Sequence, residues 1–119
     1  MRRQFQYFAA AAFAAVAALP AAARECQAPG PAPTIPDGTT ATADQMKSAR
    51  ESVQGYVNVL QDYQDCLESS IKHAPKETKQ EDLQRLRDKG NAAIDQAEAL
   101  KNNYIAQVKL FKARQPPTK

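Results

Sequence analysis

Pro75 separates two long segments whose apolar residues recur every seven positions, and this interruption constrains the fold more than any other sequence feature. Before it the recurring row comprises Met46, Val53, Leu60 and Leu67; after it the row comprises Leu83, Gly90, Ala97, Tyr104 and Phe111. A seven-residue apolar repeat is typical of a helix that buries one face. Because proline lacks an amide hydrogen and disfavours helical geometry at the residue before it, a helix must end near Ala74. The pattern therefore predicts two amphipathic helices.

The start of the first helix carries a clear local signal. Thr42 can cap a helix, and Gln45, three residues later, can complete a capping box. We therefore expect the hairpin domain to begin at residue 42 and its first helix to cover about 43–73.

The second helix has two candidate starts. Pro75 is acceptable as a first helical residue, whereas Thr78 with Glu81 forms a second potential capping box. The helix is predicted over about 76–114, because two prolines follow at positions 116 and 117. Residues 42–114 then form the hairpin, and residues 115–119 a disordered tail.

A short connection makes the two helices antiparallel neighbours. The predicted fold is therefore all-α, an antiparallel two-helix hairpin that resembles a coiled coil. A bend near Ala74 and Pro75 pairs Leu67 with Leu83 and Leu60 with Gly90, so that large residues meet small ones. Further along, the same bend pairs Val53 with Ala97 and Met46 with Tyr104. Three tyrosines fall on the inward face, where we expect core positions: Tyr56, Tyr63 and Tyr104.

The N-terminus has the features of a cleavable signal peptide over residues 1–23. Two arginines precede an apolar run from about residue 5 to residue 19, and Ala21-Ala22-Ala23 provides a small-x-small cleavage site. A transmembrane anchor needs about 20 apolar residues, which is longer than this run. The paired arginines also match the core of a twin-arginine signal, but the usual strengthening residues are missing, which favours the general secretory route. We expect no lipid on Cys26, because a charged pair, Arg24 and Glu25, directly precedes it.

The two cysteines, Cys26 and Cys66, both lie after the cleavage site, where an oxidising compartment favours a disulfide. Between the first cysteine and the hairpin, residues 24–41 contain four prolines and two glycines, which predicts an extended arm. Alternatives for such a segment are a flexible linker or a ligand for a polyproline-binding domain. A polyproline-like arm is long enough to run back along the first helix and reach Cys66. We expect it to follow the row of Val59 and Cys66, with Ile35 near the helix surface.

Charge and residue types exclude several functions. Without residues 1–23 the chain has 14 Lys plus Arg against 13 Asp plus Glu, a net charge of +1, which argues against nucleic-acid binding. The single histidine, His73, and two distant cysteines do not make a zinc site. Ser70 and His73 are an ordinary i, i+3 helix pair, as expected for a surface rather than a catalytic site. We therefore expect no enzyme activity, no cofactor, no metal and no stable membrane anchor after cleavage.

The order of several short motifs resembles a family of small secreted proteobacterial proteins of unknown function. The resemblance covers nearly the whole chain after the signal and rests on Cys26, the Pro33 to Gly38 run, Met46, Tyr56, Tyr63, Cys66-Leu67, Asn91-Ala92-Ala93-Ile94-Asp95 and Phe111-Lys112-Ala113-Arg114. It implies an exported helical hairpin, and we expect the protein in the periplasm or outside the cell. It implies no activity, cofactor or catalytic residue.

Two functions remain open from the sequence. The first is a structural or protein-interaction module that binds an unknown envelope protein or self-associates into a four-helix bundle. Its candidate interaction residues are Ile35 in the arm, and Ile105 and Leu110, which lie off the apolar rows. The alternative is a carrier of small apolar ligands or a chaperone-like binder. That alternative requires a cavity, for which a seam of alternating large and small residues leaves little room.

Overall fold

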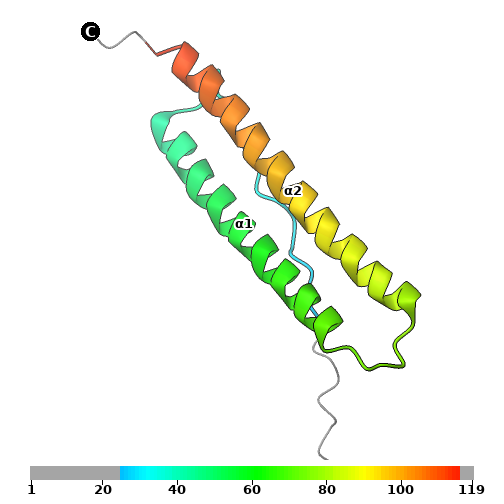
Figure 1. Cartoon of the computed structure of the whole chain (residues 1–119). Coiled ribbons are helices and arrows are strands. Elements are labelled where there is room, and N and C mark those ends of the chain that lie inside the picture. Colours follow the sequence, from blue (N-terminus) through cyan, green and yellow to red (C-terminus); the bar gives the residue numbers. More distant parts are fainter. Residues whose placement is uncertain (1–24, 116–119) are drawn as a thin grey trace, which may run out of the picture.

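The computed structural model describes residues 25–115, and within them the chain forms two antiparallel helices, α1 (Ala43–Lys72) and α2 (Gln80–Ala113) (Figure 1). This arrangement confirms the predicted hairpin. The signal-peptide prediction for residues 1–23 and most of the predicted tail lie outside the described residues. Neither helix of the described part is long and apolar enough to cross a membrane.

Helix α1 begins at the expected capping box. The Gln45 amide donates to the Thr42 hydroxyl at 3.1 Å, and the Thr42 amide donates to the Gln45 side chain at 2.9 Å. These two bonds satisfy amide groups that have no partner inside the helix. The helix ends at Lys72 with His73 as its C-cap, within one residue of the expected bound.

Helix α2 starts later than the sequence predicts. The helix begins at Gln80 instead of about residue 76, and its N-cap, Lys79, makes no side-chain capping bond. A turn occupies the expected start, because the Thr78 amide donates to the Pro75 carbonyl at 3.0 Å. The Thr78 side chain is therefore too early to cap, and the connection between the helices is a seven-residue loop, 73–79.

The longer loop changes the pairing of the two helices. A Cβ on Gly90 would lie 3.9 Å from the Leu67 side chain, so Gly90 faces Leu67 and not Leu60 as predicted. The same register places Leu60 opposite Ala97. The predicted pairing is thus wrong by one heptad, a shift that leaves both apolar rows facing each other. The buried side chains of the two helices are Met46, Ala49, Val53, Leu60, Leu67, Ala93 and Leu100.

The Pro-rich arm runs along the hairpin from its loop end towards its open end (Figure 1). At the loop end Cys26 is joined to Cys66 by a disulfide, with 5.7 Å between the Cα atoms, as predicted. Further along, the Tyr56 hydroxyl donates to the Gly30 carbonyl at 2.7 Å and accepts from the Gln96 amide at 2.9 Å. Because Tyr56 belongs to α1 and Gln96 to α2, the arm lies in the groove between the two helices.

At the open end the arm meets the backbone of α2. A Cβ on Gly38 would lie 2.0 Å from the Gln107 carbonyl oxygen, so no larger residue fits there. The Gly38 amide donates to the Gln107 side chain at 2.8 Å, and Arg114 donates to the carbonyls of Gly38 and Ala41. Glycine at position 38 therefore allows the arm to dock on α2.

This course differs from the predicted one. Val59, on the row expected to support the arm, is 48% exposed, because the arm lies over the groove and not over that row. Ile35, Tyr56 and Tyr63 are half-buried; Tyr56 is bonded to the arm, and Tyr63 lies beside Cys26 in the lining of a hollow, so neither tyrosine is the fully buried core residue that was expected. The sequence predicted that the arm returns to Cys66 but placed it on α1 alone.

Candidate interaction site

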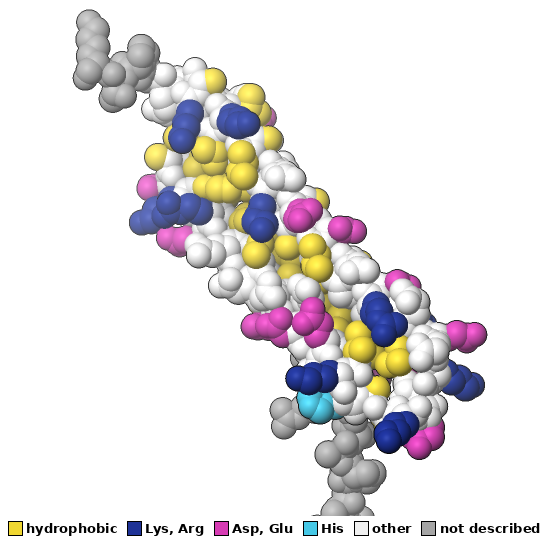
Figure 2. Space-filling view, in the orientation of Figure 1, with side chains coloured by type: hydrophobic (Ala, Val, Ile, Leu, Met, Phe, Trp, Pro, Cys, Tyr) yellow, Lys and Arg dark blue, Asp and Glu magenta, His cyan; other side chains and the backbone are white. Residues whose placement is uncertain are grey.

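The arm divides the hairpin into two faces. We call the groove that holds residues 26–41 the covered groove and the groove on the opposite side the uncovered groove. Figure 2 shows the uncovered groove, where apolar side chains form a diagonal band between charged side chains of both helices. An open hollow lies in each groove, and these two hollows are the candidate sites.

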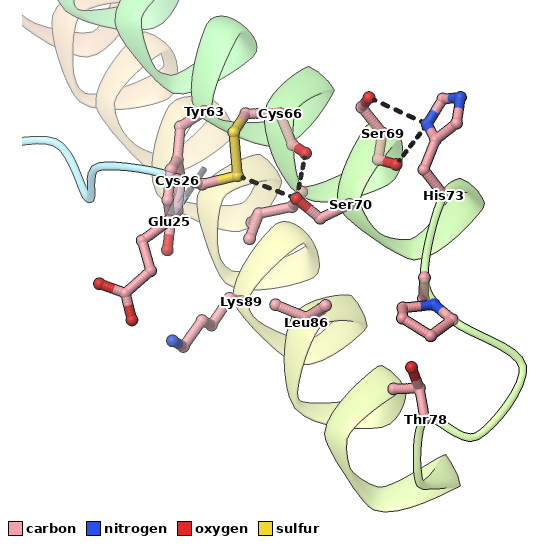
Figure 3. Close-up of a pocket in the computed structure, with 13 residues that line it drawn as sticks. Glu25, Cys26, Tyr63, Cys66, Ser69, Ser70, His73, Thr78, Leu86 and Lys89 are labelled. Carbon is pink, nitrogen blue, oxygen red and sulfur yellow. Dashed lines mark hydrogen bonds between the residues drawn. A yellow bond between two sulfur atoms is a disulfide. The ribbon is translucent and has the colours of Figure 1, made fainter. Parts of the chain in front are cut away.

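The hollow of the covered side lies at the loop end, beside the disulfide (Figure 3), and has a volume of about 860 Å³. Its apolar lining includes Tyr63, Leu67 and Leu86, and the disulfide forms part of its wall. Polar groups surround the apolar lining: Glu25, Ser69, Ser70, His73, Thr78 and Lys89. The site is thus an apolar hollow with a mixed-charge rim, a composition that suits a small apolar ligand.

The serines beside this hollow make structural hydrogen bonds. The Ser70 hydroxyl donates to the Cys66 carbonyl at 3.0 Å and lies 3.5 Å from the Cys26 sulfur, so it supports the disulfide and does not point at the histidine (Figure 3). The Ser69 hydroxyl lies 3.4 Å from Nδ1 of His73, and the same nitrogen lies 2.9 Å from the Ser69 carbonyl. Both residues are exposed, and these bonds cap the last turn of α1.

Among the described residues, no hydrogen bond or ion pair links a carboxylate to His73, and no group of three or more His, Cys, Asp or Glu is arranged to hold a metal ion. A histidine activates a serine as a nucleophile when a third group orients the histidine and hydrogen-bond donors stabilise the oxyanion. The hydrogen bonds of Ser69 and His73 therefore belong to the last turn of α1, and those of Ser70 support the disulfide.

The hollow of the uncovered groove lies near the open end and has a volume of about 480 Å³. Its floor is formed by four apolar or aromatic side chains: Met46, Tyr104, Val108 and Phe111. Its rim is formed by Lys47, Arg50 and Lys112, with no acidic residue among the lining. Within residues 25–115, none of these three cations forms an ion pair with a carboxylate. The hollow therefore combines apolar surface with three positive charges whose counter-charges are not supplied by neighbouring side chains.

The predicted interaction residues fall on different faces. Ile105 is 49% exposed and lies one turn before Val108, so it belongs to the uncovered side. Leu110 is 43% exposed but lies one turn from Gln107 and Arg114, which hold the arm. The structure therefore does not bring Ile105, Leu110 and the half-buried Ile35 together.

One residue of the uncovered face was missed by sequence reasoning. Ile94 is 38% exposed and lies eleven residues, about three turns, before Ile105, so both isoleucines lie on one side of α2. The i, i+11 spacing was visible in the sequence. Sequence reasoning considered only Ile105 and Leu110 on this helix as candidates for an interaction surface.

Asp37 organises the turn where the arm joins α1. Its carboxylate accepts hydrogen bonds from the Thr39 hydroxyl at 2.7 Å and the Thr39 amide at 2.9 Å, which together lower the pKa of Asp37. The positive charge of Arg114 lowers this pKa further. Because the Asp37 carbonyl also accepts from the amides of Thr40 and Ala41, the residue fixes the turn that positions Gly38.

Comparison with known proteins adds no identity to this geometry. No protein-family model matches the sequence, and no functionally described protein and no solved structure is significantly similar to it. The resemblance to secreted proteobacterial proteins therefore stays a prediction.

Proposed function

We propose that the protein is an exported, non-enzymatic interaction module of the bacterial envelope, which presents its uncovered groove to a protein partner. Export is supported by the signal-like segment 1–23 and by the disulfide between the two cysteines that follow it. Disulfides persist in oxidising compartments and are rare in the cytosol.

The observation that carries the proposal is the exposure of Ile94 and Ile105 on the one groove that the arm leaves open. A large aliphatic side chain that stays half-exposed on a helix face forgoes the stabilisation that burial brings, about 25 cal/mol for each Å² of apolar surface. On an interaction protein that stabilisation is recovered when the partner binds.

Affinity capture with crosslinking from the envelope fraction of the cell tests this proposal. We expect the wild-type protein to be crosslinked to a defined partner, and the I94E and I105E variants to lose that product. Leu110→Glu is the matched control, since Leu110 is similarly exposed but lies beside the arm. A crosslinked product that survives both isoleucine changes would contradict the proposal.

Export is tested separately by N-terminal sequencing of the protein from the same fraction. We expect the mature protein to start at Arg24, after cleavage behind Ala23. A protein that stays in the cytoplasm with residues 1–23 attached would contradict the proposed location in the envelope.

The loop-end hollow favours a second candidate, a carrier of small apolar ligands. Its volume of about 860 Å³ lies in the range of small-molecule sites, about 300–1,000 Å³. A fluorescent apolar probe tests this candidate. Binding that is lost in a Leu86→Glu variant and retained in Ile105→Glu would favour the carrier, whereas no binding to the native protein would eliminate it.

A further inference from the structure

The uncovered groove carries a pattern of charges that suits a partner of one particular kind. Arg50 lies on the rim of its hollow, and Glu68 follows 18 residues later on the same helix. Eighteen residues are five turns of an α-helix, so both side chains project from the same side of α1, about 27 Å apart along the helix axis. Both are exposed, and neither forms an ion pair within the described part of the chain.

The exposed isoleucines are centred at the same height of the hairpin. The midpoint between Arg50 and Glu68 is position 59 of α1, and the contact of Gly90 with Leu67 places position 98 of α2 level with it. Ile94 and Ile105 are centred between positions 99 and 100, about 2 Å away along the axis. The charged pair and the apolar pair therefore share one centre.

A two-fold axis that passes through that centre, perpendicular to the helices, exchanges the positions of the two residues of each pair. In a symmetric dimer of this kind, residue i contacts residue j and residue j contacts residue i. Arg50 of one copy then faces Glu68 of the other at two places, and Ile94 of one copy comes within about one turn of Ile105 of the other. The opposite arrangement, with both open ends together, brings the two cationic hollows against each other.

We propose that the occupant of the uncovered groove is a second copy of this chain, docked antiparallel into a four-helix bundle with both arms on the outside. This inference rests on the proposed function and names its partner. The arm determines the size of the assembly, because it leaves each hairpin a single apolar face. Pairing through that face closes the dimer and exposes no further apolar groove.

Light scattering on the exported protein, purified with its disulfide intact, gives the first test. We expect the mass of a dimer, and we expect I105E to reduce it to a monomer without lowering its helix content. A monomer at about 100 μM, a concentration at which even weak dimers form, would overturn the inference.

Charge reversal tests the antiparallel register. R50E and E68R each place two like-charged pairs in the dimer, so we expect each variant alone to dimerise at least tenfold more weakly than the wild type. Mixing the two variants places opposite charges at both positions, and we expect the dimer to return. Lys89→Glu is the matched control, because Lys89 lies on the rim of the loop-end hollow. Weakening without restoration on mixing would overturn the inference.

The same variants separate this inference from the proposed function. A protein that is monomeric but still captures another envelope protein through Ile105 contradicts self-pairing and leaves the interaction module intact. A monomer that captures nothing through Ile105 contradicts both.

Discussion

The two grooves of the hairpin are built from the same apolar repeat, yet the chain treats them differently. The covered groove holds the arm through a disulfide at one end, the Tyr56 hydroxyl in the middle and Gly38 at the other end. The uncovered groove has no such segment over it within residues 25–115 and keeps Ile94 and Ile105 exposed. A hairpin with two open apolar faces can stack without limit, whereas one covered face restricts it to a single contact. In the proposed assembly, the arm therefore limits each hairpin to one contact.

Removing the disulfide should have the largest effect, and it acts on the covered groove. The bond closes a loop of 40 residues, for which the chain-entropy estimate gives about 4 kcal/mol of stabilisation. We expect C26S/C66S, or reduction of the wild type, to lower the thermal midpoint by at least about 15 °C. Circular dichroism against temperature measures this change.

The control for the disulfide is treatment of C26S/C66S itself with reductant, which should change nothing. If reduction leaves the midpoint of the wild type unchanged, the arm is held by its hydrogen bonds and the staple is dispensable.

Gly38→Val should have the next largest effect, about 2–3 kcal/mol, because its side chain would overlap the backbone of α2. Either the arm end lifts away from Gln107 and Arg114 or the helix shifts. Gly30→Ala is the matched control, since a Cβ there meets nothing within 4 Å. Chemical denaturation of both variants measures the difference. Equal stabilities would show that the arm end is not docked as described.

How much of this contrast was visible in the sequence depends on the range of the interaction involved. The capping box at Thr42 and the break at Pro75 are local, and the structure shows both. The pairing of Cys26 with Cys66 was also accessible, because a chain with two cysteines allows only one intramolecular bond.

The register was not accessible from the repeat. Shifting one helix by seven residues preserves every apolar row, so the pattern allows the pairing of Gly90 with Leu60 or with Leu67 equally well. The length of the 73–79 loop decides between them, and that length depends on the turn between Pro75 and Thr78. The sequence also did not show that the arm contacts both helices, because the fit of Gly38 against Gln107 is a tertiary contact without a local sequence signal.

Tyr56→Phe sharpens the comparison at the level of one hydroxyl group. It removes the hydrogen bond to the Gly30 carbonyl and the hydrogen bond from Gln96. We expect the free energy of unfolding to fall by about 1 kcal/mol. Tyr104→Phe is the control from the uncovered groove, because the structure gives the Tyr104 hydroxyl no hydrogen-bond partner within the described residues. Denaturation should rank the wild type and Tyr104→Phe together above Tyr56→Phe. If Tyr104→Phe were the less stable of the two variants, the Tyr56 hydroxyl would not be the group that holds the arm.

The smallest expected effect concerns Asp37, which is fully exposed and acts through its bonds to Thr39. Its pKa is lower in the folded chain than in the unfolded chain, so the unfolded chain binds the proton more readily. The stability that Asp37 contributes is therefore present above the unfolded pKa and is lost as the pH falls through the folded pKa, in the range below about pH 4. We expect Asp37→Asn to lower the thermal midpoint slightly at pH 7 and to approach the wild type as the pH falls and the Asp37 carboxyl becomes protonated. Midpoints measured across this range test the sign, and a difference that grew on acidification would mean that the carboxylate destabilises the turn. Because this turn holds the arm only on the covered side, the mass in solution of Asp37→Asn at neutral pH should equal that of the wild type.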